Sequence, residues 1–523
     1  MGRISRRAAI AGLVALPVLY FGGRKVMALS ADPTGPKSCL PPDGPVEPVT
    51  EASDLPGLIR GGAIDDFSCL NATPIYGRIA VKSIADIQAA VRYARANGLT
   101  LSAAGVRHSM GGQAFGPGNL VLDMTALNAI RVDPAGMTVT VGAGATWHDI
   151  QEKLHPLLAV KAMQSTDIFT VGGSISVNAH GMDHQVGALM RTIRSMTVVM
   201  ADASLRIVSP ATDPDLFALI VGGYGLFAVI AEVELEVTEN VVYDSGRTVI
   251  PTADFPAWFA DTILPNADIG LFYGHLSTAP GSGFLREMLI FTYTYAGPAG
   301  TDVPPLGPVG FVKTRRLILN LAKENAVFAT AKWFAEKQLD PLFESCTVTR
   351  QDALVADGHA CLVSRNEPMH DSVPYLMNAL TDQSDILHEY FVPRANLLAF
   401  IDAVRPLLAN SGLPVLNASV RVVHHEDNVL TYAPEDAFSL VLYISQPANA
   451  DGNAKMAALT AALIDATIAH GGRFFLPYQL HYTAEQLQAS YPEIGAFFAA
   501  KRRYDPAGIF SNTFYRKYGG DFA

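Results

Sequence analysis

The chain between about residues 74 and 238 alternates between helical and strand-like patterns. Apolar residues recur at the spacing of one helix face after a capping box at Ser83–Asp86, and Gly98 then ends the pattern, which predicts a helix. A second helix opens at Thr146. Short runs rich in Val, Ile, Leu and Thr predict strands at 99–105, 120–124, 138–145, 196–209 and 228–237, the fourth of them a hairpin that turns at Asp202–Ala203. The pattern therefore predicts a compact α/β unit.

Residues 241–480 carry a different pattern. Strand-like runs such as 288–295 and 438–445 are mixed with long, Ala-rich amphipathic helices such as 453–469. We expect a second, α+β domain there, followed by an aromatic-rich C-terminal segment that docks on the rest of the chain. The chain contains no internal repeat, which excludes a solenoid.

Composition and charge exclude several classes of function. Hydrophobic residues make up 49% and charged residues 17% of the 523 positions, which excludes a disordered or collagen-like chain. The formal net charge of −11 opposes a nucleic-acid partner, because such partners need a basic surface. The four cysteines show no C-x-x-C spacing and form neither a disulfide framework nor a metal motif. Whether Cys39 and Cys69 pair stays open.

The first 30 residues are interpreted as an export signal. Arg6 and Arg7 precede an uncharged, largely apolar run at 8–21, which is shorter than the roughly 20 residues of a spanning helix. The arginine pair resembles the twin-arginine signal, which in bacteria exports folded, cofactor-loaded proteins. We expect a periplasmic or cell-envelope protein; the alternative is an uncleaved segment that associates with the membrane. Residues 31–69 are expected to form an extended leader.

Two glycine-rich segments are candidate ligand-binding loops. In Gly105–Gln113, glycines after a strand let backbone N–H groups approach a pyrophosphate closely. His108 in this loop could ligate a metal, act as acid or base, or bond covalently to a cofactor; the plainer interpretation is a half-exposed turn residue. Phe169–Gly181 likewise allows close backbone approach, or tight packing of a helix on a strand. His180 and His184 have metal-ligand spacing, but no third ligand is evident, so no metal site is predicted.

A third segment, Gly223–Ala228, matches the dinucleotide pattern G-x-G-x-x-A. That fingerprint must open a helix after the first strand of a βαβ unit, whereas this segment leads directly into a predicted strand. A Rossmann site is therefore rejected. The chain also lacks a P-loop, H-E-x-x-H and G-x-S-x-G, the usual signals of phosphoryl transfer, zinc proteolysis and α/β-hydrolase chemistry.

Together, the segments at 105–124, 169–181 and 222–235 resemble, in order and spacing, the vanillyl-alcohol-oxidase-type FAD-binding domain, also called the PCMH-type domain. The H-S-x-x-G-Q-A run from His108 is similar to that of cytokinin dehydrogenases. The sequences D-P-x-x-x-F-x-N from Asp505 and E-Y-F-V-P from Glu389 resemble alditol and sugar-lactone oxidases. The resemblance implies an α+β fold: a two-part FAD-binding domain at 70–240, an α+β substrate (cap) domain at 241–480, and a tail at 481–523 that returns to the FAD domain.

The resemblance also implies FAD as the cofactor, held by an 8α-histidyl bond to His108. Arg107 departs from the glycine that is usual before this histidine. Residues 168–169 lack the cysteine of berberine-bridge-type relatives, which implies a single covalent attachment. The pyrophosphate is expected against the two glycine-rich segments and the adenine near Ile230. The full set of implied FAD contacts is Gly105, Arg107, His108, Ser109, Gly111, Gly112, Gln113, Thr170, Gly172, Gly173, Ser174, Asn178, His180, Ile230 and Asn512.

Four residues are candidates for catalysis. Asp167 precedes the F-T-V-G-G turn, as the base of cytokinin dehydrogenases does, although it could equally cap the next helix. Arg421 matches a cap arginine of alditol oxidases, whose neighbouring Glu is replaced here by Ser419. His481 stands where those enzymes have Lys. Both changes oppose a polyol or aldonolactone bound in the usual way and make His481 a candidate base, with Glu389 near it.

The predicted function is oxidation of a small alcohol, amine or sugar-like substrate. Such a reaction needs hydride transfer to flavin N5, a base for the O–H or N–H proton, and oxygen or another acceptor for the electrons. The alternatives are a flavin-dependent reductase of C=C bonds and a flavin-binding module that has lost its chemistry.

Overall fold

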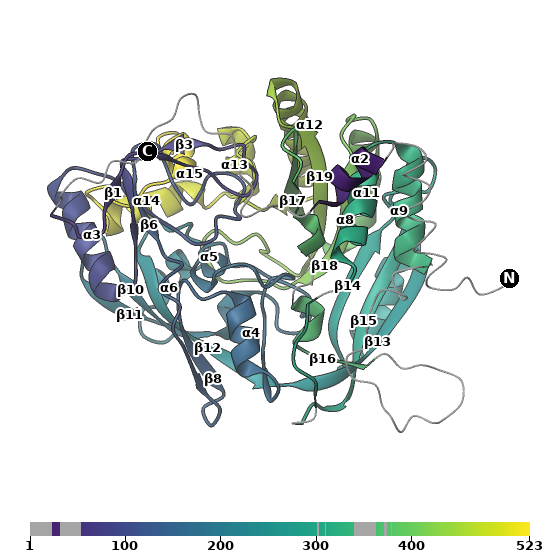
Figure 1. Cartoon of the computed structure of the whole chain (residues 1–523), viewed down its shortest axis with the longest axis horizontal. Coiled ribbons are helices and arrows are strands. Elements are labelled where there is room, and N and C mark those ends of the chain that lie inside the picture. The colour runs from purple at the N-terminus through teal and green to yellow at the C-terminus, as the bar shows by residue number, and fades with distance from the viewer. Residues whose placement is uncertain are drawn as a thin grey trace.

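The computed structural model describes residues 23–31, 54–300, 303–308, 310–338, 362–370, 374–377 and 379–522. Figure 1 shows the chain as two halves. The N-terminal sheets and the C-terminal helices form one half, and a large sheet with its helices forms the other. Two long consecutive strands, β12 (Val229–Glu239) and β13 (Val241–Pro251), belong to different sheets, so the chain passes between the halves at Asn240.

The first half contains two main sheets. The four-stranded sheet has the order β1-β4-β6-β5 and pairs β4, β6 and β5 in parallel; its strands are β1 (Ile59–Arg60), β4 (Gly77–Ala80), β5 (Leu101–Ala104) and β6 (Leu120–Asp123). The second sheet is antiparallel, with the order β11-β10-β12-β8-β7 and with β9 paired to the end of β12. Its other strands are β7 (Ile130–Asp133), β8 (Thr138–Gly142), β9 (Leu158–Val160), β10 (Ile193–Val199) and β11 (Leu205–Val208). A small ribbon pairs β2 (Ala63–Ile64) with β3 (Thr73–Pro74).

Capping boxes begin two of the helices of this half. At α3 (Ile84–Ala96), the Ser83 side chain accepts from Asp86 N, and the Asp86 carboxylate accepts from Ser83 N at 2.9 Å. Thr146 and Asp149 do the same for α4 (Trp147–Leu154). Each box satisfies two of the backbone donors that a helix leaves free at its start. The remaining helices are α5 (Val171–Ser176) and α6 (Pro214–Ile220).

The second half is built on one antiparallel sheet with the order β16-β13-β15-β14-β18-β19-β17-β20. Besides β13, its strands are β14 (Ile269–Leu276), β15 (Glu287–Pro298), β16 (Leu362–Ser364), β17 (Gln383–Pro393), β18 (Val415–Val423), β19 (Ala437–Pro447) and β20 (Arg473–Phe474). Helices α11 (Leu397–Ala409) and α12 (Ala450–Ala469) pack on β17 and β19 (Figure 1). Because β19 is buried on both faces, it appears in the sequence as a largely apolar run, whereas the equally buried β17 carries polar residues such as Asp385, His388 and Glu389. The other helices are α7 (Phe255–Trp258), α8 (Val312–Leu321) and α9 (Ala326–Gln338).

The C-terminal segment returns to the first half, where α13 (Ala484–Ser490), α14 (Ile494–Tyr504) and α15 (Thr513–Tyr518) lie. Phe510 forms a parallel bridge to Leu101 and so covers the edge of β5. Asp505 accepts the backbone N–H groups of Ile509 and of Phe510 itself, at 3.0 and 2.7 Å. Asn512 caps α15 and donates Nδ2 to Tyr224 O at 2.7 Å. The D-P-x-x-x-F-x-N sequence therefore has a structural role in docking the tail.

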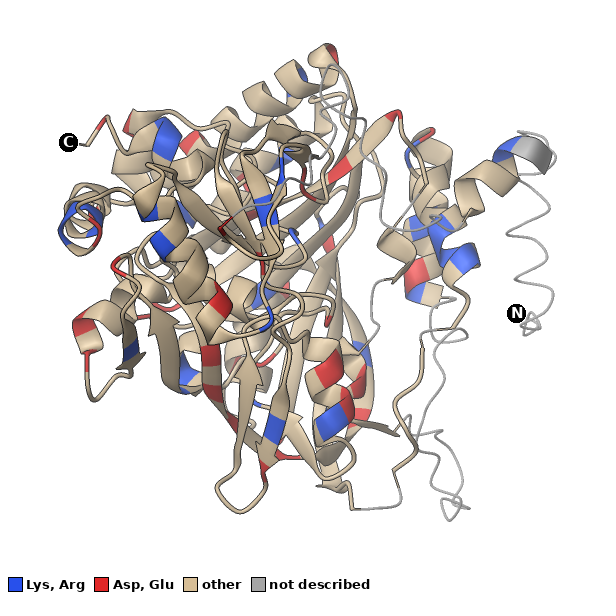
Figure 2. Cartoon of the chain, turned by 60° about the vertical axis from the view of Figure 1, so that its left-hand side comes forward, with Lys and Arg blue, Asp and Glu red and all other residues tan. Residues whose placement is uncertain are grey.

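The α+β fold expected from the sequence is confirmed. The hairpin of β10 and β11 turns at 200–204, with Ala203 in the left-handed region at φ 67°. Gly223–Ala228 leads into β12, as expected when the Rossmann interpretation was rejected. Acidic and basic residues are interspersed over both halves (Figure 2).

The N-terminal predictions fall mostly outside the described residues. Of the segment 1–30, the structure describes α2 (Gly23–Ser30), whose Val26 and Leu29 pack on Leu317 and Leu321 of α8. Cys69 is disulfide-bonded, but Cys39 lies outside the described residues, so whether these two cysteines pair stays open. Within the described ranges, no helix combines the length and apolar character needed to cross a bilayer.

Replacing Asn512 by Ala tests its docking role. The change removes a helix cap, worth about 1 kcal/mol, and leaves the buried Tyr224 carbonyl without its donor, at a cost of about 1–3 kcal/mol. We expect the free energy of unfolding in urea to fall by about 2–4 kcal/mol. Asn449→Ala is the matched control, because Asn449 caps α12 from an exposed position through one bond. Equal losses in the two variants would contradict this role of Asn512.

Candidate active site

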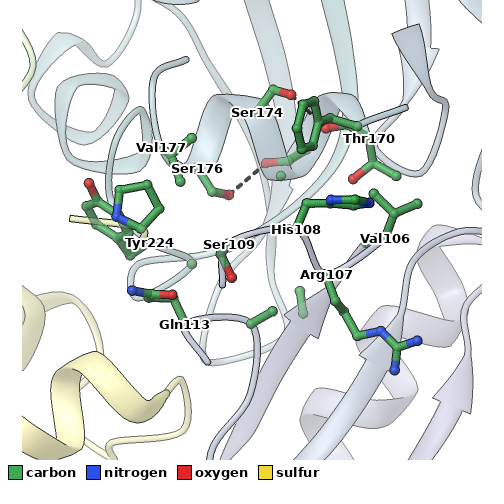
Figure 3. A pocket seen from close by; sticks show the side chains of 18 of the residues that line it. Val106, Arg107, His108, Ser109, Gln113, Thr170, Ser174, Ser176, Val177 and Tyr224 are labelled. Carbon is green, nitrogen blue, oxygen red and sulfur yellow. Dashed lines mark hydrogen bonds between the residues drawn. The ribbon is translucent and has the colours of Figure 1, made fainter. Parts of the chain in front are cut away.

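A cavity with about 1080 Å³ of empty space, partly open to solvent, lies where several separate stretches of the chain meet. Figure 3 shows that side chains of both glycine-rich segments surround the same space. Its wall comprises Ala103, Gly105–Ser109, Gln113, Ala114, Met124, Ala143, Gln164, Phe169, Thr170, Gly172–Ser174, Ser176, Val177, Tyr224, Gly225, Ala228–Ile230, Leu387, Phe475, Pro477 and Tyr478. The tertiary fold thus brings both predicted loops to one site.

The loop at 105–113 needs glycine at defined places. A Cβ at Gly105 would overlap Thr170 Oγ1, so this residue allows the two glycine-rich segments to touch. Gly112 has φ +73°, which favours glycine. Arg107 also lies in the left-handed region, at φ 58°, which explains in physical terms why glycine suits this position. The Arg107 side chain extends away from the other labelled side chains (Figure 3).

Asp66 holds this loop in place through hydrogen bonds to its backbone. Its Oδ2 accepts from Gly112 N at 2.9 Å and from Asn71 Nδ2 at 2.8 Å, and its Oδ1 accepts from Ser68 N at 3.0 Å. Burial raises the pKa of Asp66 to about 6, although these donors and the Ser68 hydroxyl oppose that shift. The sequence analysis did not identify Asp66, because a lone Asp in a leader-like stretch carries no motif.

The second glycine-rich segment forms the start of α5. A Cβ at Gly172 would lie 2.8 Å from Ala143 Cβ, so this glycine is required by close packing on the residue after β8. The Ser174 hydroxyl accepts from Trp147 Nε1 at 3.0 Å and donates to Gln164 and to Thr170 O. Ser176 Oγ donates to Gly172 O at 2.7 Å. Both interpretations of this segment therefore hold: it packs tightly, and it lines the cavity.

His108 lies at one end of the cavity between two aromatic rings. Its imidazole stacks on Phe67, with 4.2 Å between ring centroids, and Phe169 meets it edge-on at 5.1 Å. Burial, and then the charge of Arg107, lower the pKa of His108 to about 4. The imidazole is therefore neutral at neutral pH and retains a nitrogen lone pair.

A group of polar side chains lies beyond the other end of the cavity. Tyr478 lines the cavity and also borders a smaller one, with about 250 Å³ of empty space, that Glu389 lines. Glu389 Oε1 lies 2.7 Å from His180 Nε2, and both side chains are buried. Burial would raise the pKa of Glu389, but His180 and Arg421 outweigh it and hold that pKa below its ordinary value.

The charges of this group depend on one another. Burial raises the pKa of the Tyr478 hydroxyl well above its usual range, with the Glu389 charge adding to the rise. Burial lowers the pKa of Arg421, against the opposing charge of Glu389. Arg421 Nη1 donates to Ser165 Oγ. The result is a buried carboxylate held between an imidazole and a guanidinium, with a protonated phenol toward the cavity.

Several implied FAD contacts do not line the cavity. Gly111 and Gly112 belong to the loop at 105–113 but do not line the cavity, and a Cβ at Gly111 would overlap Tyr478 O. Asn178 accepts from Met190 N at 3.0 Å, while His180 faces Glu389 and Asn512 binds Tyr224 O. These residues support the wall from outside. The others of the implied set, including Ile230, line it.

Two of the candidate catalytic residues also lie off the cavity. Asp167 Oδ2 lies 3.0 Å from His148 Nδ1 on α4. The prediction that it caps the next helix is wrong, because Thr170 is the N-cap residue of α5. His481 borders neither cavity; burial, and then the charge of Lys517, lower its pKa to about 4. The segment 477–481 does reach the site, but through Tyr478.

Sequence reasoning missed three further parts of the wall. Gln164, Tyr224 and Phe475 line the cavity, but the sequence analysis assigned no role to any of them. Tyr224 lies in the segment 222–235, which carried part of the family resemblance, yet that resemblance implied a contact only for Ile230. The segment contributes Tyr224, Gly225 and Ala228 to the cavity as the chain enters β12.

The polar groups that line the cavity fit FAD. Among the described residues, Ser109 Oγ and Gln113 Oε1 are buried and have no hydrogen-bond partner, so polar groups point at the cavity without protein partners. The volume suits an elongated cofactor, and the glycines let its wall approach closely.

Comparisons with known proteins agree with this interpretation. Residues 77–209 match the model of the FAD binding domain family, and residues 317–518 match that of the D-arabinono-1,4-lactone oxidase family. The chain is 35% identical over 174 residues to decaprenylphosphoryl-beta-D-ribose oxidase of Mycolicibacterium smegmatis, covering 32% of this chain and 38% of that enzyme. It is 32% identical over 190 residues to an uncharacterized oxidoreductase of the fasciation locus of Rhodococcoides fascians, covering 35% and 41%.

A third relative, glucooligosaccharide oxidase of Sarocladium strictum, is 30% identical over 161 residues, covering 30% of this chain and 32% of that enzyme. The similarity thus spans less than half the length of each relative. The two family models cover separate parts of the chain, and the cavity lies where those parts meet. The resemblance found in the sequence is confirmed: the two matches support an FAD-dependent oxidoreductase with a PCMH-type FAD-binding domain.

Proposed function

We propose that this protein oxidises a small alcohol, amine or sugar-like substrate and passes the electrons to oxygen or another acceptor. The observation that carries the proposal is Tyr478, which borders both the FAD cavity and the smaller cavity lined by Glu389. FAD, when bound, supplies the two-electron acceptor for a hydride. The chain must then supply binding, orientation and a place for the substrate proton.

The residues around Tyr478 are suited to these tasks. The raised pKa of the Tyr478 hydroxyl keeps it protonated, so it orients a substrate oxygen or nitrogen as a hydrogen-bond donor. Glu389 has a pKa below its ordinary value and stays ionised, so it accepts the proton of the substrate O–H or N–H group. His180 holds this carboxylate in place, and Arg421 stabilises its charge.

The names of the relatives support a hydroxyl-bearing substrate. Those relatives include a decaprenylphosphoryl-beta-D-ribose oxidase and a glucooligosaccharide oxidase, and the second family model is named for a sugar lactone. A screen of alcohols, sugars, lactones and amines under anaerobic conditions separates the alternatives. Bleaching of the flavin by one of these classes supports oxidation. If none of them bleaches the flavin, reoxidation of the dithionite-reduced flavin by an activated alkene favours a C=C reductase, and the lack of that reoxidation favours a binding module.

We also propose that His108 holds FAD covalently. The buried, neutral imidazole between Phe67 and Phe169 has the free lone pair that a bond to the flavin 8α carbon requires. In forming it, His108 gives up its ring N–H proton, and the methyl carbon gives up a proton and two electrons, which the electron acceptor removes. Arg107 does not block this role, because its side chain extends away from the His108 ring (Figure 3).

Acid precipitation tests the covalent bond. In the unaltered protein we expect the washed, redissolved pellet to carry the visible absorbance of flavin. In His108→Ala the flavin should appear in the supernatant instead, because no other histidine lines the cavity. His425→Ala, at an exposed histidine, is the control and should leave the flavin in the pellet. Free flavin from the unaltered protein would refute the bond and leave the FAD site intact.

The pH dependence of attachment follows from the lowered pKa of His108. An exposed histidine, with a pKa near 6.5, is about one-tenth neutral at about pH 5.5. Because His108 has a pKa of about 4, it stays neutral at that pH and gains a proton only as the pH falls through about 4. When flavin-depleted protein receives FAD, we expect equal initial rates of acid-stable attachment at about pH 5.5 and about pH 7.5. A roughly tenfold slower rate at the lower pH would contradict the lowered pKa.

Glu389→Gln tests the proton acceptor. Loss of a general base typically costs about 10²–10⁴-fold in rate, so we expect kcat to fall in that range while the flavin spectrum is unchanged. Glu426→Gln is the matched control, since Glu426 is also a buried, paired glutamate but lines neither cavity. Equal kcat values in the two variants would remove Glu389 from the mechanism.

We propose, finally, that the protein is exported through its twin-arginine-like segment and remains in the periplasm or cell envelope. The packing of α2 on α8, with an ion pair of 2.7 Å between Lys25 and Glu324, favours retention of residues 23–31 in the folded protein. Retention of the preceding apolar run would then anchor the chain to the membrane.

A further inference from the structure

Two histidines and a buried aspartate meet outside the FAD cavity. Their ligand atoms, one each from His148, Asp167 and His370, all lie within 4.8 Å of one another, the one such group among the described residues. We infer that these residues bind a divalent transition-metal ion of the zinc type. The three come from α4, from the loop before α5, and from the end of the 3₁₀ helix η4 (Glu367–Met369).

The spacing within the group suits shared coordination. His148 Nδ1 lies 3.0 Å from Asp167 Oδ2, and the rings of His148 and His370 stack with 4.6 Å between their centroids. Ligands of a tetrahedral zinc ion, with bonds of about 2.0–2.1 Å, lie roughly 3.3 Å apart. The ligand atoms need to move by only about an ångström from these positions to coordinate one ion, which small side-chain rotations allow.

A fourth ligand lies in reach. Glu152 follows His148 by four residues on α4, so both side chains project from the same helix face. Glu152 Oε1 lies 3.6 Å from His370 Nε2. Asp149, also on α4, is engaged with Thr146 in the capping box. Glu152 lies outside the group of three, but a rotation of its exposed side chain would add a second carboxylate oxygen to the two imidazole nitrogens and the Asp167 carboxylate.

The donor set and its burial favour a transition metal. Imidazole ligands suit zinc, copper, nickel and iron(II), whereas magnesium and calcium take sets made of oxygen. The Asp167 side chain is fully buried and that of His370 is 3% exposed, so the interior holds two ligands in place. The His148 side chain is 39% exposed, which leaves a path from solvent.

The metal would join the two halves of the molecule. Gln151 Nε2 on α4 donates to Asn366 O at 2.8 Å, and Asn366 Nδ2 donates to Leu158 O at 3.0 Å, so the 362–370 segment already docks there. A bound ion adds a bond from His370 to α4 and to the Asp167 loop. That loop continues to Phe169, whose ring meets His108, so the ion would also steady one wall of the FAD cavity.

Zinc binding by the untagged holoprotein tests the inference. After treatment with a chelator and removal of excess reagent, the protein is titrated with ZnCl₂ against a chromophoric zinc indicator. We expect about one zinc ion per chain and a higher unfolding temperature with zinc, while MgCl₂ at the same concentration has no effect. The variants His148→Ala and His370→Ala should bind zinc at least about tenfold more weakly. His425→Ala is the control, because His425 also lies beside a carboxylate, Asp427, but on the surface.

The outcomes decide the matter without reference to activity. Weaker binding in His148→Ala with unchanged binding in His425→Ala supports the site. His148 is partly exposed, so this variant decides the question even if His370→Ala fails to fold. No zinc uptake by the unaltered protein, or the same affinity in all three variants, would overturn the inference. An equal effect of MgCl₂ would overturn the assignment to a transition metal.

Discussion

The close approach of three distant chain segments is the constraint on which the rest of the structure depends. Gly105 touches Thr170, and Gly111 touches the carbonyl of Tyr478, at places where any Cβ would overlap its neighbour. Gln113 completes the junction by donating Nε2 to Leu476 O at 2.8 Å and to Tyr478 O at 2.9 Å. Since interiors are packed without spare volume, a side chain added at either glycine would push these segments apart.

This junction explains how one site draws on both halves of the chain. The wall at 105–109 and 169–177 comes from the FAD-binding half, whereas Leu387 comes from β17 of the large sheet. The C-terminal tail secures the arrangement from behind. Thr513 N donates to Phe115 O at 2.9 Å, and Asn512 holds the Tyr224 carbonyl. The tail therefore fixes the position of two cavity walls without contacting the cavity itself.

Burial sets the chemical character of the groups around the cavity. An imidazole in a dry, aromatic surrounding loses its proton, as the lowered pKa of His108 shows. A buried carboxylate stays ionised only where positive or donating partners offset the cost of desolvation. His180 and Arg421 provide that for Glu389. At Tyr478, burial and the charge of Glu389 outweigh the opposing charge of Arg421, so the phenol stays protonated. The same low-dielectric interior thus produces a neutral imidazole, an ionised carboxylate and a protonated phenol.

The sequence by itself determined the local elements and the cofactor. Capping boxes at Ser83 and Thr146, the hairpin turn at 202–203 and the apolar runs of β12 and β19 depend on neighbours within a few positions, and they form where the patterns predict. The glycine-rich loops and the tail motif pointed to FAD through their resemblance to a known family, which short local motifs suffice to carry. Only the tertiary structure decided which side chains face the cavity.

Which side chains face the cavity depends on contacts between residues that are hundreds of positions apart in the sequence, and no local pattern shows such contacts. The segment 477–481 was recognised, but the turn of the chain directs Tyr478 rather than His481 toward the cavity. Asp167 was placed next to the correct loop, yet its side chain faces His148 on the opposite side. Asn512 carried a motif and proved to be a docking residue, since the orientation of a side chain is set by what packs against it.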